Sequence, residues 1–82
     1  MNYEEGAEYS IPDGDGFSEL YLTEVPGASL GPGKRDLISE SVYEYGSRAG
    51  FWRLVSLFAQ RNIKVTIFGA ALALERNPAA AA

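Results

Sequence analysis

Two adjacent carboxylates near the start of the chain have the spacing of a catalytic pair. Glu4 and Glu5 directly precede Gly6, a residue that lets the backbone turn sharply. Neighbouring carboxylates repel each other, so one member of a partly buried pair can serve as a base near neutral pH. A solvated Glu-Glu-Gly turn is the alternative interpretation, and the residue pattern leaves both open.

A second group of polar side chains occurs at residues 43–48, Tyr-Glu-Tyr-Gly-Ser-Arg, just before an apolar stretch. If a helix starts here, its free N–H groups can bind an anion or a polarised carbonyl, and Arg48 in the first turn adds a bidentate donor. An ion pair between Arg48 and the acidic half of the chain is the simpler interpretation of the same arginine. Both interpretations remain open at the level of the sequence.

The amino-acid composition narrows the chemistry that these residues can perform. The 82 residues include no cysteine and no histidine. This excludes disulfides, thiolate metal sites, cysteine nucleophiles and the imidazole group that most often serves as base or metal ligand near neutral pH. The net charge of −4 also argues against a nucleic-acid-binding module, which normally has a basic surface. Carboxylate chemistry, or no chemistry, remains.

The charge is distributed unevenly along the chain. Residues 1–44 contain ten acidic and two basic residues, whereas residues 45–82 contain one acidic and five basic residues, so the two halves are expected to attract each other. No run of 18 consecutive apolar residues occurs, and the N-terminus is acidic, which predicts neither a membrane span nor a secretory signal. A cytoplasmic protein is therefore expected.

Residues 6–46 are predicted to form one long loop. Glycine and proline are concentrated in residues 6–36, partly in turn-forming pairs such as Pro26-Gly27. The segment 17–25 interrupts the loop with enough apolar residues for a short helical turn or strand. A connection of this length is typical of a binding or active-site loop.

An amphipathic helix is predicted over residues 47–61. Its apolar side chains recur at positions i, i+3, i+4 and i+7, namely at Phe51, Leu54, Val55 and Phe58. Ser47 is the expected N-cap and Asn62 the expected C-terminal stop. Trp52 widens the apolar face and is expected in the core.

The remaining segments predict an α/β fold. Residues 63–68 are rich in β-branched side chains and predict a strand, and residues 70–77 predict a helix that ends before Pro78. With a strand end at residues 1–5, they form a βαβα unit with parallel strands, in a single partial domain over residues 1–82. Because a two-stranded parallel sheet with one short strand is a poor folding unit, the chain is expected to be part of a larger fold.

Four segments of the chain together form a characteristic combination. They are Asn2-Tyr3-Glu4-Glu5-Gly6, residues 41–54, residues 65–69 and residues 73–78. The combination resembles the polysaccharide deacetylase superfamily, which has the NodB-homology fold, and within it the cofactor-independent allantoinase branch of urate catabolism. The run Tyr-Glu-Tyr-Gly-Ser-Arg-Ala-Gly-Phe-Trp-Arg at residues 43–53 is its most specific part.

The resemblance implies a distorted (β/α)7 barrel that hydrolyses C–N bonds of amides or cyclic amides, of which this chain is an N-terminal fragment with a truncated first strand. In metal-dependent members of the superfamily, the first motif contains two aspartates, one a general base and the other a metal ligand. Glu4 matches the base position and Glu5 the ligand position. Glutamate at both places, as in the allantoinase branch, implies no metal site, and no cofactor is expected.

The resemblance thus implies a fragment of an allantoinase-like hydrolase that acts on a small-molecule amide such as allantoin and is inactive by itself. Its predicted catalytic residues are Glu4 and Glu5, and its predicted substrate contacts are Tyr3, Glu44 and Arg48. One alternative is a deacetylase of polysaccharides or N-acetyl sugars. The other is a non-catalytic fragment that forms homo-oligomers through its apolar helix face and the edge of strand 63–68. Neither nucleic acid nor a membrane is an expected partner.

Overall fold

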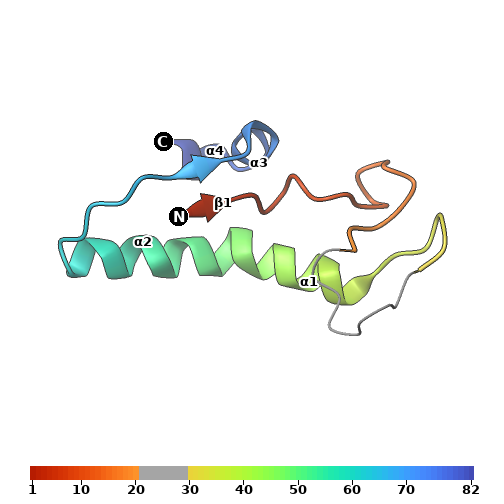
Figure 1. Ribbon diagram of the computed structural model, residues 1–82, viewed down its shortest axis with the longest axis horizontal. Helices are drawn as coiled ribbons and strands as arrows, with labels where there is room; N and C mark the ends of the chain where they lie inside the picture. The colour runs from red at the N-terminus through yellow and green to blue at the C-terminus, as the bar shows by residue number, and fades with distance from the viewer. Residues whose placement is uncertain (21–29) are drawn as a thin grey trace.

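The computed structural model describes residues 1–20 and 30–82. A long helical rod runs along one side of the molecule (Figure 1), and both the two-stranded sheet and the C-terminal residues pack against it. In chain order the elements are β1 (Asn2–Tyr3), α1 (Leu37–Tyr45), the π-helical turn η1 (Gly46–Gly50), α2 (Phe51–Gln60), β2 (Phe68–Gly69), α3 (Ala71–Arg76) and α4 (Pro78–Ala81).

The rod begins earlier than the sequence predicts. The Asp36 side chain is the N-cap of α1 and accepts hydrogen bonds from the backbone N–H groups of Ile38 and Ser39, at 3.0 and 3.1 Å. The predicted loop over residues 6–46 is therefore too long, since its last eleven residues cap or form helix. Ser47 is not the N-cap, because it lies inside the rod, where its hydroxyl donates to the Glu44 carbonyl at 3.2 Å.

The end of the rod is where the sequence places it. Asn62 adopts a positive φ of 52°, and the Ile63 N–H donates to the Phe58 carbonyl at 2.9 Å. A left-handed residue that returns the chain in this way is a common helix C-terminus, and asparagine tolerates it better than most residues. Asn62 as the C-terminal stop is confirmed.

The two strands pair in parallel, with Asn2 opposite Phe68 and Tyr3 opposite Gly69. The N–H groups of Phe68 and Ala70 donate to the carbonyls of Met1 and Tyr3, both at 2.9 Å. Parallel pairing is as predicted, but β2 has only two residues, and the expected strand over residues 63–68 is too long. The residues that directly precede Phe68 have no partner strand among the described residues, because β1 begins at Asn2. Next to them the Met1 amino group donates a hydrogen bond to the Thr66 carbonyl at 2.9 Å.

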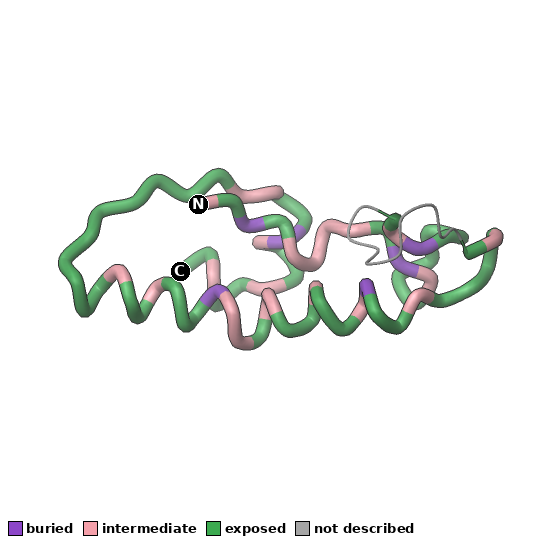
Figure 2. The backbone as a smooth tube through the Cα atoms, turned by 60° about the horizontal axis from the view of Figure 1, so that its bottom comes forward, coloured by how far each residue is buried: buried purple, intermediate pink, exposed green. Residues whose placement is uncertain are grey.

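The core contains one large side chain from each of two elements and a small one from a third. Tyr3 of β1, Phe51 of α2 and Ala73 of α3 are buried, and the rings of Tyr3 and Phe51 lie 4.7 Å apart (Figure 2). Trp52 was expected in the core but is 38% exposed, and its ring meets the Phe51 ring edge-on at 4.9 Å. Successive helical side chains point about 100° apart, so burying Phe51 turns Trp52 away from the sheet.

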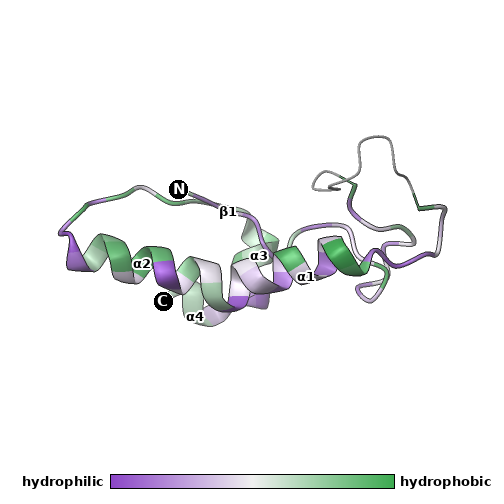
Figure 3. Cartoon of the chain, turned by 90° about the horizontal axis from the view of Figure 1, so that it is seen from below, coloured by the Kyte–Doolittle hydropathy of each residue, from purple (hydrophilic) through white to green (hydrophobic). Residues whose placement is uncertain are grey.

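Large apolar side chains are also exposed on α1, on α2, on the loop after β1 and on the segment that leads to β2. Figure 3 shows hydrophobic residues along α2 and at the start of α1. Leu54 and Leu57 of α2 are 42% and 45% exposed, and Phe68 of β2 is 74% exposed. The described residues thus form a partial α/β unit with one small core and a broad uncovered apolar surface. None of their helices is long and apolar enough to cross a membrane.

The loop after β1 is fixed by hydrogen bonds between its polar side chains and the backbone. Asp15 accepts from the Ser10 N–H at 2.9 Å, and the Ser18 hydroxyl donates to the Lys34 carbonyl at 3.2 Å while accepting from the Asp36 N–H at 3.1 Å. The predicted short element at 17–25 falls largely, and the predicted Pro26-Gly27 turn entirely, outside the described residues.

Candidate functional site

The Glu4-Glu5-Gly6 turn directly follows β1, at the carboxyl end of the strand. The Ala7 N–H donates to the Glu4 carbonyl at 2.8 Å and closes the turn, and Gly6 adopts a φ of 106°, which an L side chain rarely tolerates. The Arg76 guanidinium, from the end of α3, donates to the Gly6 carbonyl and to Asp13. Backbone and side chain together hold the two acids in place.

Three predicted site residues lie together on one side of this turn. Glu5, Glu44 of α1 and Arg48 of η1 line a cavity of about 580 Å³, whose other polar lining comes from Ser47, Arg76 and Asn77. The Glu5 carboxylate accepts a hydrogen bond from the Glu4 N–H at 3.1 Å. Side chains separated by some forty residues therefore meet because the rod packs beside the end of β1.

Within this cavity Arg48 and Glu44 form an ion pair. Arg48 Nε lies 2.5 Å from Glu44 Oε1, one helical turn away, and the two side chains are 78% and 59% exposed. Ion pairs this exposed contribute little to stability, so a ligand that offers the same hydrogen bonds competes with the pair at small cost. The ion-pair interpretation of Arg48 is confirmed, and it leaves the arginine available to a ligand.

Glu4 lies on the opposite side of the turn. It lines a smaller cavity of about 190 Å³ with Glu8, Glu19 and Tyr43. Burial raises the pKa of the Tyr43 hydroxyl above its usual 10, and the negative charges of Glu19 and Glu8, followed by those of Glu4 and Glu5, raise it further. Tyr43 therefore keeps its proton at neutral pH and is a hydrogen-bond donor among carboxylates.

Sequence reasoning missed the group around Glu4. Tyr43 stands in the motif at residues 43–48, but nothing in the spacing of Glu8 and Glu19 indicates that they come near it. Only the fold of the loop brings them together. Among the residues that the structure describes, no three acidic side chains are placed to hold a metal ion.

Tyr3, a predicted substrate contact, is only 1% exposed. Its hydroxyl accepts a hydrogen bond from Asn77 Nδ2 at 2.8 Å. The same amide nitrogen donates a second hydrogen bond to the Ser47 carbonyl at 3.4 Å. Tyr3 therefore lies beneath the site, where its ring packs on Phe51 of the rod and its hydroxyl holds Asn77, which lines the cavity.

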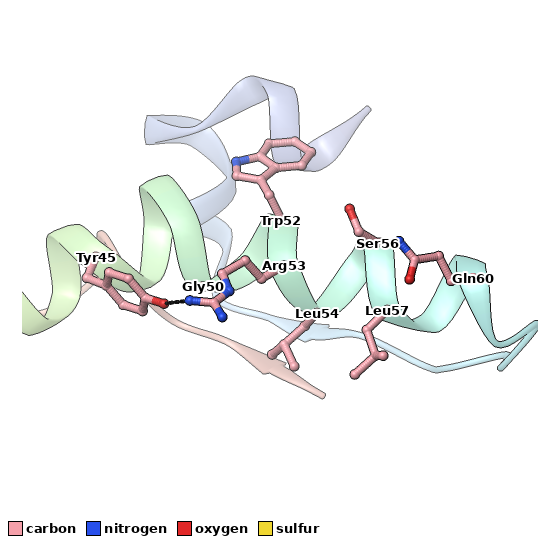
Figure 4. Close-up of a pocket in the computed structure, with 8 residues that line it drawn as sticks. All are labelled: Tyr45, Gly50, Trp52, Arg53, Leu54, Ser56, Leu57 and Gln60. Carbon is pink, nitrogen blue, oxygen red and sulfur yellow. Dashed lines mark hydrogen bonds between the residues drawn. The ribbon is translucent and has the colours of Figure 1, made fainter.

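A shallower depression follows the outer surface of α2 (Figure 4). Arg53 donates to the Tyr45 hydroxyl at 2.8 Å, and Trp52 points to the opposite side of the helix from Leu54 and Leu57. None of the five predicted site residues lines this surface. The acidic turn and its cavity therefore remain the candidate site.

Comparison with known proteins finds relatives that match almost the whole chain. It matches no protein-family model. It is 41% identical over 80 residues to a protein of Schizosaccharomyces pombe described provisionally as a polysaccharide deacetylase, a match that covers 95% of this chain and 25% of that protein. A crystal structure of a probable polysaccharide deacetylase from Pseudomonas aeruginosa PAO1 superimposes with a TM-score of 0.82 at 50% identity. Over 95% of its length, the chain is similar to proteins of the polysaccharide deacetylase superfamily.

A second crystal structure in the superfamily, that of PuuE allantoinase, superimposes with a TM-score of 0.81 at 49% identity. Each of the two crystal structures covers 95% of this chain, while this chain covers 26% of each of them. The chain thus spans about a quarter of the length of these superfamily members. The resemblance drawn from the sequence motifs is confirmed, and the roles of the individual site residues stay predictions.

Proposed function

We propose that this chain supplies one part of an allantoinase-like hydrolase that cleaves a C–N bond in a cyclic amide, as in the hydrolytic ring opening of allantoin to allantoate. The observation that carries the proposal is the meeting of Glu5, Glu44 and Arg48 in one cavity, from three different elements. The 49% identity to an allantoinase over almost the whole chain supports it.

The proposed chemistry uses groups of opposite character on the two sides of an amide. Arg48 donates to the carbonyl oxygen and stabilises the negative charge that develops there, while Glu44 accepts a hydrogen bond from a ring N–H. Glu5 is the proposed base in place of Glu4, which matches the base position of the superfamily, because Glu5 lines the same cavity as Arg48. Glu5 takes a proton from the attacking water, the water oxygen bonds to the carbonyl carbon, and the C–N bond breaks as Glu5 passes this proton to the ring nitrogen. Glu4, on the other side of the turn, is the second proposed catalytic carboxylate.

In isolation the chain is expected to be inactive. Catalysis requires polar groups held to within a fraction of an ångström, which a small packed unit with a largely exposed site does not provide. In superfamily members the matched segment makes up only a quarter of the chain. In α/β barrels, catalytic groups come from several strand ends, and most of those would lie in the unmatched part.

A deacetylase of polysaccharides or N-acetyl sugars is the second candidate. It is favoured by the descriptions of the proteins from S. pombe and P. aeruginosa, of which the second matches this chain as well as the allantoinase does, at 50% against 49% identity. The same residues serve both reactions, because an acetamide also offers a carbonyl oxygen and an N–H group to Arg48 and Glu44. A self-associating fragment is the third candidate, favoured by the exposed apolar side chains of α2 and β2.

Two hybrid enzymes test the proposal. In one, this chain replaces the matching quarter of PuuE allantoinase, and in the other it replaces the matching quarter of the P. aeruginosa protein. We expect the allantoinase hybrid to hydrolyse allantoin, and Glu5→Gln to lower its kcat by about 100-fold or more. Arg61→Ala, which changes an exposed arginine at the end of α2, is the control and should leave kcat within about threefold.

The outcome separates the candidates. Full activity of the P. aeruginosa hybrid on N-acetylated sugar chains, with an inactive but folded allantoinase hybrid, favours the deacetylase. Large assemblies of the isolated chain in sedimentation runs favour the self-associating fragment. Indifference of both hybrids to Glu5→Gln would refute a hydrolytic role for this site.

A further inference from the structure

Gly46, the first residue of η1, lies against the side chain of Glu5. A Cβ atom placed on Gly46 would lie 2.5 Å from Glu5 Cγ and 3.0 Å from both Cδ and Oε1. Non-bonded carbon atoms do not approach each other to 2.5 Å, so any other residue at position 46 requires Glu5 to move. The rod thus has a slot, formed by the missing side chain of Gly46, in which Glu5 lies.

The reason for glycine at this position is space and not backbone conformation. Gly46 has φ −57° and ψ −48°, which every residue adopts in a right-handed helix. Glycine is a poor helix former compared with alanine, so the position is unfavourable for the rod considered alone. Gly50, at the other end of η1, has the same conformation, but a Cβ there would make ordinary contacts with Tyr45, whose Cε1 lies at 3.4 Å and whose Cδ1 and carbonyl oxygen lie at 3.7 Å.

Glu5 has little freedom to leave the slot. The turn that carries it is closed by the Ala7 N–H on the Glu4 carbonyl and held by Arg76 on the Gly6 carbonyl. Its carboxylate accepts a hydrogen bond from the Glu4 N–H at 3.1 Å. In addition, η1 is a π-helical turn, a local irregularity that occurs frequently at functional sites.

We infer that Gly46 is a positioning residue for Glu5. Its slot holds the Glu5 side chain against the rod, and so fixes the carboxylate in the same cavity as Glu44 and Arg48. The importance of this position for hydrolysis depends on the proposed function, whereas the contact itself does not.

The contact is tested on the 82-residue chain by NMR and by a double-mutant cycle. We expect nuclear Overhauser contacts between the Glu5 γ-methylene protons and the Gly46 α-protons. Gly46→Ala should lower the melting temperature of the wild-type chain but raise it in a Glu5→Ala background, because removing Cγ empties the slot and leaves only the better helix propensity of alanine. Gly50→Ala is the matched control and should not lower the melting temperature in either background.

Absence of the Glu5–Gly46 contacts, or an equal loss of melting temperature from Gly46→Ala in both backgrounds, would overturn the inference. In the allantoinase hybrid, Gly46→Ala should lower kcat on the order of 100-fold and leave KM nearly unchanged, whereas Gly50→Ala should not. If Gly46→Ala lowers the melting temperature of the wild-type chain and raises that of Glu5→Ala, while Glu5→Gln leaves the kcat of the hybrid unchanged, the contact is supported and the proposed function is refuted.

Discussion

Phe51 and Phe68 show how differently the two sides of the molecule are built. Phe51 of α2 is 7% exposed and packs on Tyr3, whereas Phe68 of β2 is 74% exposed although it sits in the sheet. On the side of β1 that faces the rod, the apolar side chains are buried in a small, complete core (Figure 2). The segment leading to β2 exposes Ile63, Val65 and Ile67 as well.

This difference explains why a chain that matches a quarter of its relatives' length has a recognisable site. The acidic turn and its cavity depend on the finished side, where Tyr3 and Phe51 fix β1 against the rod. The exposed side presents apolar surface of the kind that proteins normally cover with further structure.

Phe51→Ala should have the largest effect. Replacing a buried phenylalanine by alanine costs about 3–5 kcal/mol, a large fraction of the stability of a chain this short. Phe68→Ala, the matched change on the exposed side, should alter the free energy of unfolding by about 0.5 kcal/mol or less. Urea unfolding followed by circular dichroism measures both, and equal losses would show that the two sides do not differ.

Tyr3→Phe should have an intermediate effect. It keeps the ring on Phe51 but removes the hydroxyl that accepts from Asn77 Nδ2, so the free energy of unfolding should fall by about 1–2 kcal/mol. Asn77→Ala removes the same hydrogen bond from the other partner. Non-additive losses in the double variant, measured by urea unfolding, are expected, and strictly additive ones would argue against this bond.

Arg76→Ala should destabilise the acidic turn by about 1 kcal/mol, because the guanidinium holds both the Gly6 carbonyl and Asp13. Asp13→Asn removes only the ion pair, whose partners are both partly exposed, and should cost less. Thermal unfolding of the two variants measures the difference. A larger loss from Asp13→Asn than from Arg76→Ala would contradict the assignment of the Gly6 carbonyl as the main partner.

Tyr43 offers a test with a small effect on stability. Its pKa is raised by burial and by the carboxylates around it, so folding favours the neutral hydroxyl. Its stabilising contribution should be complete below pH 10, the usual tyrosine value, and be lost as the pH rises through the higher folded pKa. In a spectrophotometric titration, Tyr43→Phe should remove one tyrosine ionisation at a pH above 10, and an unchanged titration curve above pH 10 would contradict the raised pKa of Tyr43.

Local patterns were sufficient for the elements whose residues contact one another within a few turns. The apolar stripe on α2 and the Asn62 stop are local features, and the parallel order of the strands follows from the intervening helix. The turn at the end of β1 could be predicted from the sequence Glu-Glu-Gly, because Gly6 has the positive φ that the turn requires.

The start of the rod could not be predicted in the same way. Residues 37–45 form helix under the Asp36 cap, but Gly46 and Gly50 interrupt the pattern like helix breaks. Whether a glycine ends a helix or makes room for a neighbour depends on a residue elsewhere, here Glu5. Tyr43 meets Glu8 and Glu19 through the same kind of distant contact, and no spacing encodes it.

Amide hydrogen exchange tests most directly whether one side of the chain is finished and the other is completed by the rest of a larger fold. In the isolated chain, the amides of Phe68 and Ala70, which are bonded to β1, should exchange slowly, and those of residues 64–67 should exchange without protection. In the allantoinase hybrid, residues 64–67 should become protected as well. Protection of residues 64–67 in the isolated chain, or none in the hybrid, would contradict the account.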